Sequence, residues 1–175
     1  MLDSGTGSEG WKKPARSEAD IVAHGRIFDQ LDLSRVMIKA RELMKLTNEQ
    51  ADVLELWYRR HLWLCYKYPG KGNVPVSAVD EVWHCHILFT RAYMADCDRI
   101  FGRYLHHNPH VGAEKDDPAH AANFQRTAHR FQEEFGEDML VLRSRFPDQP
   151  LMAKSGPSQP HECDDVRPAR APCFD

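Results

Sequence analysis

Apolar residues recur three and four positions apart through the middle of the chain, which is the spacing of one face of an α-helix. Ser34 precedes the run RVMIKARELMK and is expected to cap it. Thr47, with Gln50 three residues later, forms a capping box for a long helix that runs through WYRRHLWLCYKY and ends at Pro69-Gly70. These signals predict two consecutive helices before residue 70.

The next helix is expected to open at Ser77, which has Asp80 three residues later as a second capping signal, and to carry the segment VDEVWHCHILFTRAYMADC. Further along, Pro118 suits a first helical position, and AHAANFQRTAHRFQEEFG spaces its phenylalanines along one face up to a stop at Gly136. The short run MLVL that follows is compatible with a strand or with a last helix. The pattern therefore predicts an all-α fold, a single-domain irregular helical bundle.

The two ends of the chain lack this periodicity. Residues 1–16 are rich in Gly and Ser, and residues 150–175 are rich in Pro. Both segments are therefore expected to be flexible tails around a helical domain of residues 17–149.

Composition narrows the classes of function. The 175 residues carry a formal net charge of -3, so no nucleic acid is expected as a partner. No segment has the apolar length of a membrane span, and the first residues hold charges and glycines where a secretory signal would be apolar. The five cysteines form no Cys-x-x-Cys pair, which suits free thiols in a reducing compartment. We therefore expect a cytoplasmic protein whose partner is a protein, a peptide or a small molecule.

The segment at 79–97 encloses polar side chains among apolar ones. Each helical residue turns by about 100°, so His84 and His86 point about 160° apart and cannot bind one ion from an unbroken helix. Two polar stripes result: one contains Asp80, His84 and Arg91, and the other contains Trp83, His86, Thr90, Tyr93 and Cys97. The second stripe could present an imidazole, a hydroxyl and a thiol to one cavity. It could equally be a packed core whose histidine is satisfied by hydrogen bonds.

Three more histidines follow in the segment RYLHHNPH, namely His106, His107 and His110. Along a straight helix His84 and Phe101 would be about 26 Å apart. This second cluster therefore reaches the first only if the chain reverses at the end of the helix or earlier.

The helices on either side of YPGKGNVP are expected to form an antiparallel hairpin. Pairing about its midpoint places His61 opposite His84, and Cys65 opposite Asp80. His61 is then either a third member of a site or a filler at the helix interface.

Residues 74–110 resemble the signature of the glycine-rich-domain-containing-protein-like family. The shared features are Trp-His-x-His at 83–86, Tyr-x-x-Asp-Cys at 93–97 and His-His-x-Pro at 106–109. The resemblance implies a domain of unknown function with no settled activity to carry over. It also implies that the Trp-His-x-His core would carry a reaction, if one were common to the family.

The first hypothesis is a small metal-binding protein or metalloenzyme that acts on a peptide or small molecule with Zn²⁺, Fe²⁺ or Cu²⁺. Its candidate ligands are His84, His86, His106, His107, Asp80 and Cys97, and Trp83, Thr90, Tyr93, His61 and His110 would line the cavity or support the ligands. We favour His86 over His84 as the ligand, because the stripe of His86 also carries Thr90, Tyr93 and Cys97, whereas Asp80 already offers His84 a local partner.

Two other functions are compatible with the same residues. The main alternative is a non-catalytic interaction module in which the Trp-His-x-His motif is structural. Metal-free thiol chemistry at Cys97 would require an exposed thiol with a low pKa.

Overall fold

The computed structural model describes residues 17–19, 22, 28, 31–108 and 118–146. Six helices are found there: α2 (Ser34–Met44), α3 (Asn48–Lys67), α4 (Ser77–Leu88), α5 (Thr90–Phe101), α6 (Pro118–Phe135) and α7 (Met139–Arg145). These residues contain no strand, and the run MLVL forms most of α7. The predicted all-α class is confirmed, whereas the predicted tails 1–16 and 150–175 lie outside the described residues.

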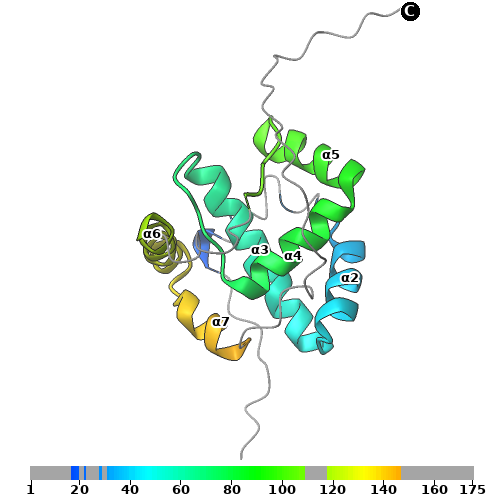
Figure 1. Ribbon diagram of the computed structural model, residues 1–175, viewed down its shortest axis with the longest axis horizontal. Coiled ribbons are helices and arrows are strands. Elements are labelled where there is room, and N and C mark those ends of the chain that lie inside the picture. Colours follow the sequence, from blue (N-terminus) through cyan, green and yellow to red (C-terminus); the bar gives the residue numbers. More distant parts are fainter. Residues whose placement is uncertain (1–16, 20–21, 23–27, 29–30, 109–117, 147–175) are drawn as a thin grey trace, which may run out of the picture.

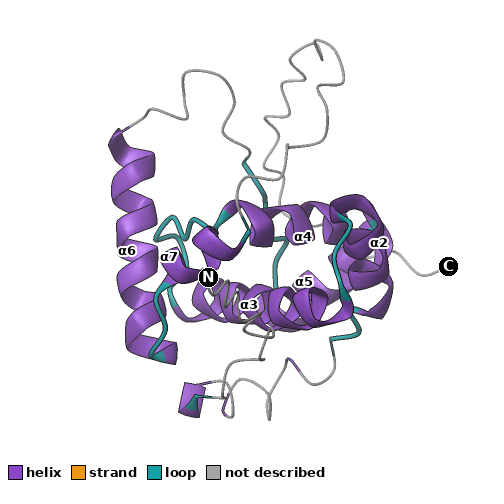
Figure 2. Cartoon of the chain, turned by 90° about the horizontal axis from the view of Figure 1, so that it is seen from below, coloured by secondary structure: helices purple, strands orange, loops and turns teal. Residues whose placement is uncertain are grey.

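Helices α3 and α4 lie at the centre of the bundle, with α2 on one side and α6 on the other (Figure 1). Helix α4 packs against α2, α3 and α5, whereas α6 packs on α3 and on the short α7. A second view shows the same order from α6 at one end to α2 at the other (Figure 2). The helix that carries the histidine motif is therefore held by three neighbours.

A continuous apolar core joins these helices. The phenylalanine stripe of α6 is confirmed, because Phe131 and Phe135 are buried and Phe124 packs partly buried against the same core. Trp57 of α3 stacks on Phe131, with ring centroids 4.3 Å apart. Burying an aromatic ring of this size stabilises a fold by about 1.5–3 kcal/mol, so this stack fixes α6 against α3.

The helix starts confirm one capping prediction and correct another. The Thr47 N–H donates to Gln50 Oε1 at 2.9 Å, and the Gln50 N–H donates to Thr47 Oγ1 at 3.2 Å, which completes the predicted capping box of α3. Ser34 is the first residue of α2 and does not cap it. Its N–H donates instead to Asp32 Oδ1 at 3.0 Å, so the carboxylate two residues earlier has the role predicted for Ser34.

The predicted capping signal of Ser77 and Asp80 is also wrong. Helix α4 begins at Ser77, and its N-cap residue, Val76, makes no side-chain capping bond. Because the Asp80 carboxylate does not close the helix start, it can contact residues from elsewhere in the chain.

The single helix predicted across 79–97 is interrupted at Phe89. This residue lies between α4 and α5, has φ −85° and ψ 58°, and bonds through its N–H to the His86 carbonyl at 3.0 Å. Its ring packs against the core, and the Arg35 guanidinium of α2 lies 5.0 Å from the ring centroid. These contacts compensate for the interrupted helix, and the chain turns back well before Gly102 (Figure 1).

Among the described residues, no helix combines the length and the apolar composition required to cross a membrane.

Candidate metal centre

Three of the predicted ligands meet at the start of α4. His107 Nε2 lies 2.8 Å from Asp80 Oδ1, and His84 Nε2 lies 3.7 Å from Asp80 Oδ2. The two imidazole rings are neighbours, with centroids 4.5 Å apart. One donor atom from each of the three side chains lies within 4.8 Å of the other two. The group has the composition of a metal site with two histidines and one carboxylate.

The interruption at Phe89 and the end of α5 bring His107 to this group. Helix α5 ends at Gly102, whose φ of 62° is the left-handed conformation that glycine adopts at least cost. The chain then returns along α4. Tyr93 O–H donates to the Leu105 carbonyl at 2.5 Å and accepts from Trp83 Nε1–H at 2.8 Å. These two bonds hold the returning segment beside α4, so the two histidine clusters meet.

The Asp80 carboxylate is ionised in this setting. Its partial burial raises the pKa, but the hydrogen bond to His107 and the nearby imidazoles of His84 and His61 outweigh burial and leave the pKa below its usual value. A carboxylate must be deprotonated to bind a metal. At neutral pH Asp80 is therefore in the form that a metal ligand requires.

His84 lies between two carboxylates. Its Nδ1 is 3.8 Å from Glu81 Oε2, while its Nε2 faces Asp80. Glu81 is the largest cause that raises the pKa of His84; partial burial opposes it and Asp80 adds to it. About a quarter of the His84 side chain is exposed, at 24%. Neither ring nitrogen is within hydrogen-bond distance of these carboxylates, and the ring is accessible from solvent.

His86 occupies a different environment on the opposite side of α4. It is 2% exposed, Tyr58 O–H lies 2.9 Å from its Nδ1, and its Nε2 lies 3.1 Å from Asp96 Oδ2. A neutral ring that accepts at Nδ1 and donates at Nε2 fits both contacts. Burial lowers the pKa of His86, against the opposing effect of Asp96. Both ring nitrogens therefore have protein partners, and His86 is not part of the group at Asp80.

Trp83, Tyr93 and Cys97 support the fold around the group. The Trp83 ring packs on His107, with centroids 4.4 Å apart. Cys97 is 2% exposed, and burial raises the pKa of its thiol. A buried neutral thiol is a poor nucleophile, so the geometry does not favour thiol chemistry at Cys97.

His61 lies behind Trp83, with ring centroids 5.3 Å apart, and its Nε2 is 3.5 Å from Cys65 Sγ. Burial lowers the pKa of His61 to about 4 and raises that of Cys65 to about 12. The pair is therefore neutral at physiological pH. The Asp80 carboxylate opposes this lowering of the His61 pKa, so the two residues are near each other, as the predicted hairpin requires. His61 is nevertheless not part of the three-residue group.

Thr90 and His106 are exposed and are not part of the group. Thr90 is exposed at the start of α5, and His106 is exposed with its ring 4.7 Å from that of Tyr104. His110 lies outside the described residues.

Two residues beside the candidate ligands were not predicted. Tyr58 belongs to the long α3 helix and is identified only by its contact with His86. Glu81 is three residues before His84, a spacing that places both on one side of a helix, so the sequence did contain a signal for it.

Comparisons with known proteins complete the description. No curated protein and no solved structure matches the chain. A family model described as UCP032817-like matches residues 26–135, which is more than half of the chain. The assignment suggested by the resemblance to the glycine-rich-domain-containing-protein-like family is therefore wrong, although the histidine motif that prompted it lies within the matched region. The chain belongs to the UCP032817-like family.

Proposed function

We propose that this protein binds a divalent transition metal through Asp80, His84 and His107. The observation that carries the proposal is that one donor atom of each residue lies within 4.8 Å of the other two. Ligand atoms around a tetrahedral ion with bonds of about 2.0–2.1 Å lie about 3.4 Å apart. Small rotations of these three partly buried side chains would bring the atoms to that spacing.

The donor set limits the choice of ion. Two imidazoles and a carboxylate suit Zn²⁺ and Fe²⁺, and imidazole also binds Cu²⁺. Three protein ligands leave coordination positions for water or for a substrate group, as in catalytic rather than closed structural sites. The partial exposure of Asp80 and His84, at 26% and 24%, supports access from solvent. The proposed role is to activate water or oxygen toward a peptide or a small molecule.

One observation favours a metal-free interaction module instead. His107 and Asp80 are already at hydrogen-bond distance, 2.8 Å. The contact could simply fasten the segment after α5 to α4. This reading requires no ion, so metal binding by the purified protein separates the two functions.

The test uses the full chain without a histidine tag. We expect about one equivalent of Zn²⁺ or Co²⁺ to bind, and H107A to lower the affinity at least 100-fold, because it removes a ligand. The matched control is H106A, the neighbouring exposed histidine, which should bind within about threefold of the wild type. Less than about a tenth of an equivalent in the wild-type protein, with no rebinding, would refute the proposal.

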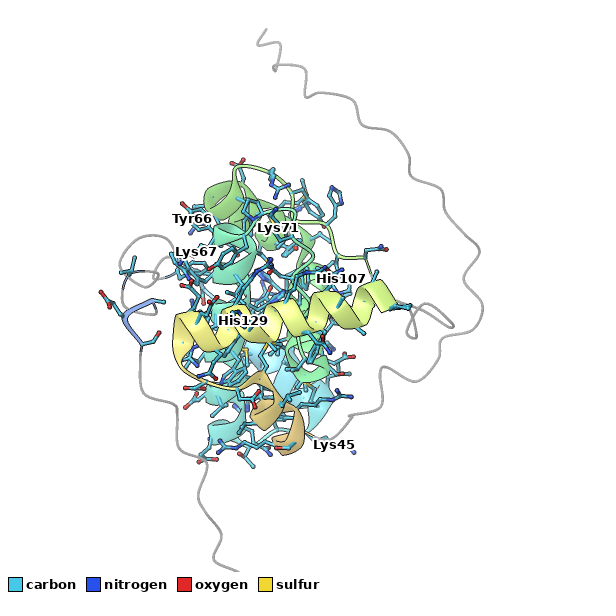
Figure 3. All side chains as sticks on the ribbon, turned by 90° about the vertical axis from the view of Figure 1, so that its left-hand side faces the viewer. Lys45, Tyr66, Lys67, Lys71, His107 and His129 are labelled. Atoms are coloured by element: carbon cyan, nitrogen blue, oxygen red, sulfur yellow. The ribbon has the colours of Figure 1, made fainter. Side chains whose placement is uncertain are left out.

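A second control lies far from the group. His129, on the outer surface of α6, is 74% exposed (Figure 3). H129A should leave metal affinity unchanged. A loss equal to that of H107A would indicate non-specific binding to surface histidines.

The cytoplasmic location of the protein stays a prediction.

A further inference from the structure

Glu81 is a buried carboxylate with an incomplete set of partners. It is 5% exposed, and its Oε1 has no hydrogen-bond partner among the described residues. Its Oε2 is directed toward His84 Nδ1, 3.8 Å away. Leaving a buried polar oxygen without a partner is costly in general, so this position calls for a hydrogen-bond donor close by.

The two nitrogens of His84 face different carboxylates. Nε2 is on the side of Asp80 and the candidate metal position, whereas Nδ1 is on the side of Glu81. Histidines that bind metals through one nitrogen usually donate the other N–H to a carboxylate or carbonyl, which fixes the tautomer and the ring orientation. Glu81 Oε2 lies on the side of His84 where such an acceptor would be needed, 3.8 Å from Nδ1, so a small shift of either side chain would close the bond.

We infer that Glu81 is a positioning residue for the metal site: it accepts the His84 Nδ1–H and thereby presents Nε2 to the ion. The inference rests on the proposed function, because it needs a metal ligated by His84.

The experiment compares E81A and E81Q with the wild type by Co²⁺ titration, followed by visible absorption, and by Zn²⁺ competition. E81A should lower affinity about 10- to 100-fold, which is the usual effect of losing such a partner. E81Q keeps an acceptor oxygen without the charge and should fall between E81A and the wild type. The matched control is E133A, because Glu133 Oε2 lies 3.3 Å from His129 Nδ1 on the exposed face of α6.

A second readout separates positioning from general stability. In the Zn²⁺-loaded wild type, the His84 Nδ1–H should give a slowly exchanging imidazole resonance in ¹H–¹⁵N spectra. E81Q should retain it and E81A should lose it, whether or not thermal stability changes.

The outcomes distinguish the two proposals. If the wild type binds no metal, the proposed function fails, and the role of Glu81 fails with it. If the wild type binds metal and E81A binds within about twofold of it, with an unchanged His84 resonance, the site stands and Glu81 has no part in it. If E81A does not fold, E81Q alone provides the test. An E81Q protein that loses the His84 resonance but keeps the metal affinity of the wild type would overturn the inference.

Discussion

The two histidines of the Trp-His-x-His motif lie two residues apart but occupy opposite environments. His86 is buried, and each of its nitrogens has a protein partner, Tyr58 or Asp96. His84 is partly exposed, and the carboxylates around it lie at 3.7 and 3.8 Å. The difference teaches that free coordination capacity, rather than the presence of a histidine in a motif, marks a candidate ligand. The predictions below test this contrast.

The largest expected effect is on folding stability. H86A removes the hydrogen-bond partner of the Tyr58 hydroxyl and of Asp96 Oδ2 and leaves a cavity in the core. It should lower the free energy of unfolding by about 3–5 kcal/mol. Urea denaturation followed by circular dichroism measures this change. A loss below about 1 kcal/mol would show that the buried hydrogen bonds of His86 do not hold α3, α4 and α5 together.

A pH effect of smaller size should come from His61. Its folded-state pKa of about 4 lies below the ordinary value of 6.5, so protonation favours the unfolded chain. The stability from keeping His61 neutral is therefore complete above about pH 6.5 and declines as the pH falls toward 4. Between pH 7.5 and 4.5 the wild type should lose about 2–3 kcal/mol more than H61F.

Urea denaturation at both pH values measures that difference. Comparison with H61F removes the contribution of the carboxyl groups that titrate in the same pH range, because both proteins contain them. Equal pH dependence in the two proteins would contradict the burial of a neutral His61.

Y58F tests one end of the buried chain of polar groups and should have the smallest effect. It leaves His86 Nδ1 without its partner but keeps the aromatic ring and the Asp96 contact. A loss of about 1–2 kcal/mol is expected in thermal or urea denaturation. Metal affinity should not change, because the Tyr58 hydroxyl bonds to His86, the histidine that faces away from the proposed site. A fall in metal affinity comparable to that of H107A would show that the surroundings of His86 and the group at Asp80 are coupled, against the separation seen in the structure.

Much of the fold could be predicted from periodicity and helix ends. The Thr47 capping box, the start at Pro118 and the phenylalanine stripe of α6 were correct, because each depends on residues within one or two turns of one another. The interruption at Phe89 was not predictable in this way. No Gly or Pro marks it, and its ring is held by contacts with a helix about fifty residues earlier in the chain.

The same interruption explains what the site prediction missed. The separation of His84 from His86 by rotation was sound, since it uses two neighbouring residues of α4. The preference for His86 depended on Thr90, Tyr93 and Cys97 continuing its stripe along one helix, and the structure places those residues on α5. Likewise, Asp80 was expected to serve His84, yet its hydrogen bond is made with His107.

The central claim is that His84 and not His86 binds the metal. The most direct measurement is the Zn²⁺ affinity of H84Q and H86Q, which make the same change two residues apart, determined by chelator competition in the same buffer. We expect H84Q to lose about 100-fold or more in affinity, because a neutral amide replaces a ligand. H86Q, whose amide can still donate to Asp96, should bind within about threefold of the wild type while unfolding at lower urea concentration. The reverse pattern, with affinity lost in folded H86Q and retained in H84Q, would contradict the account.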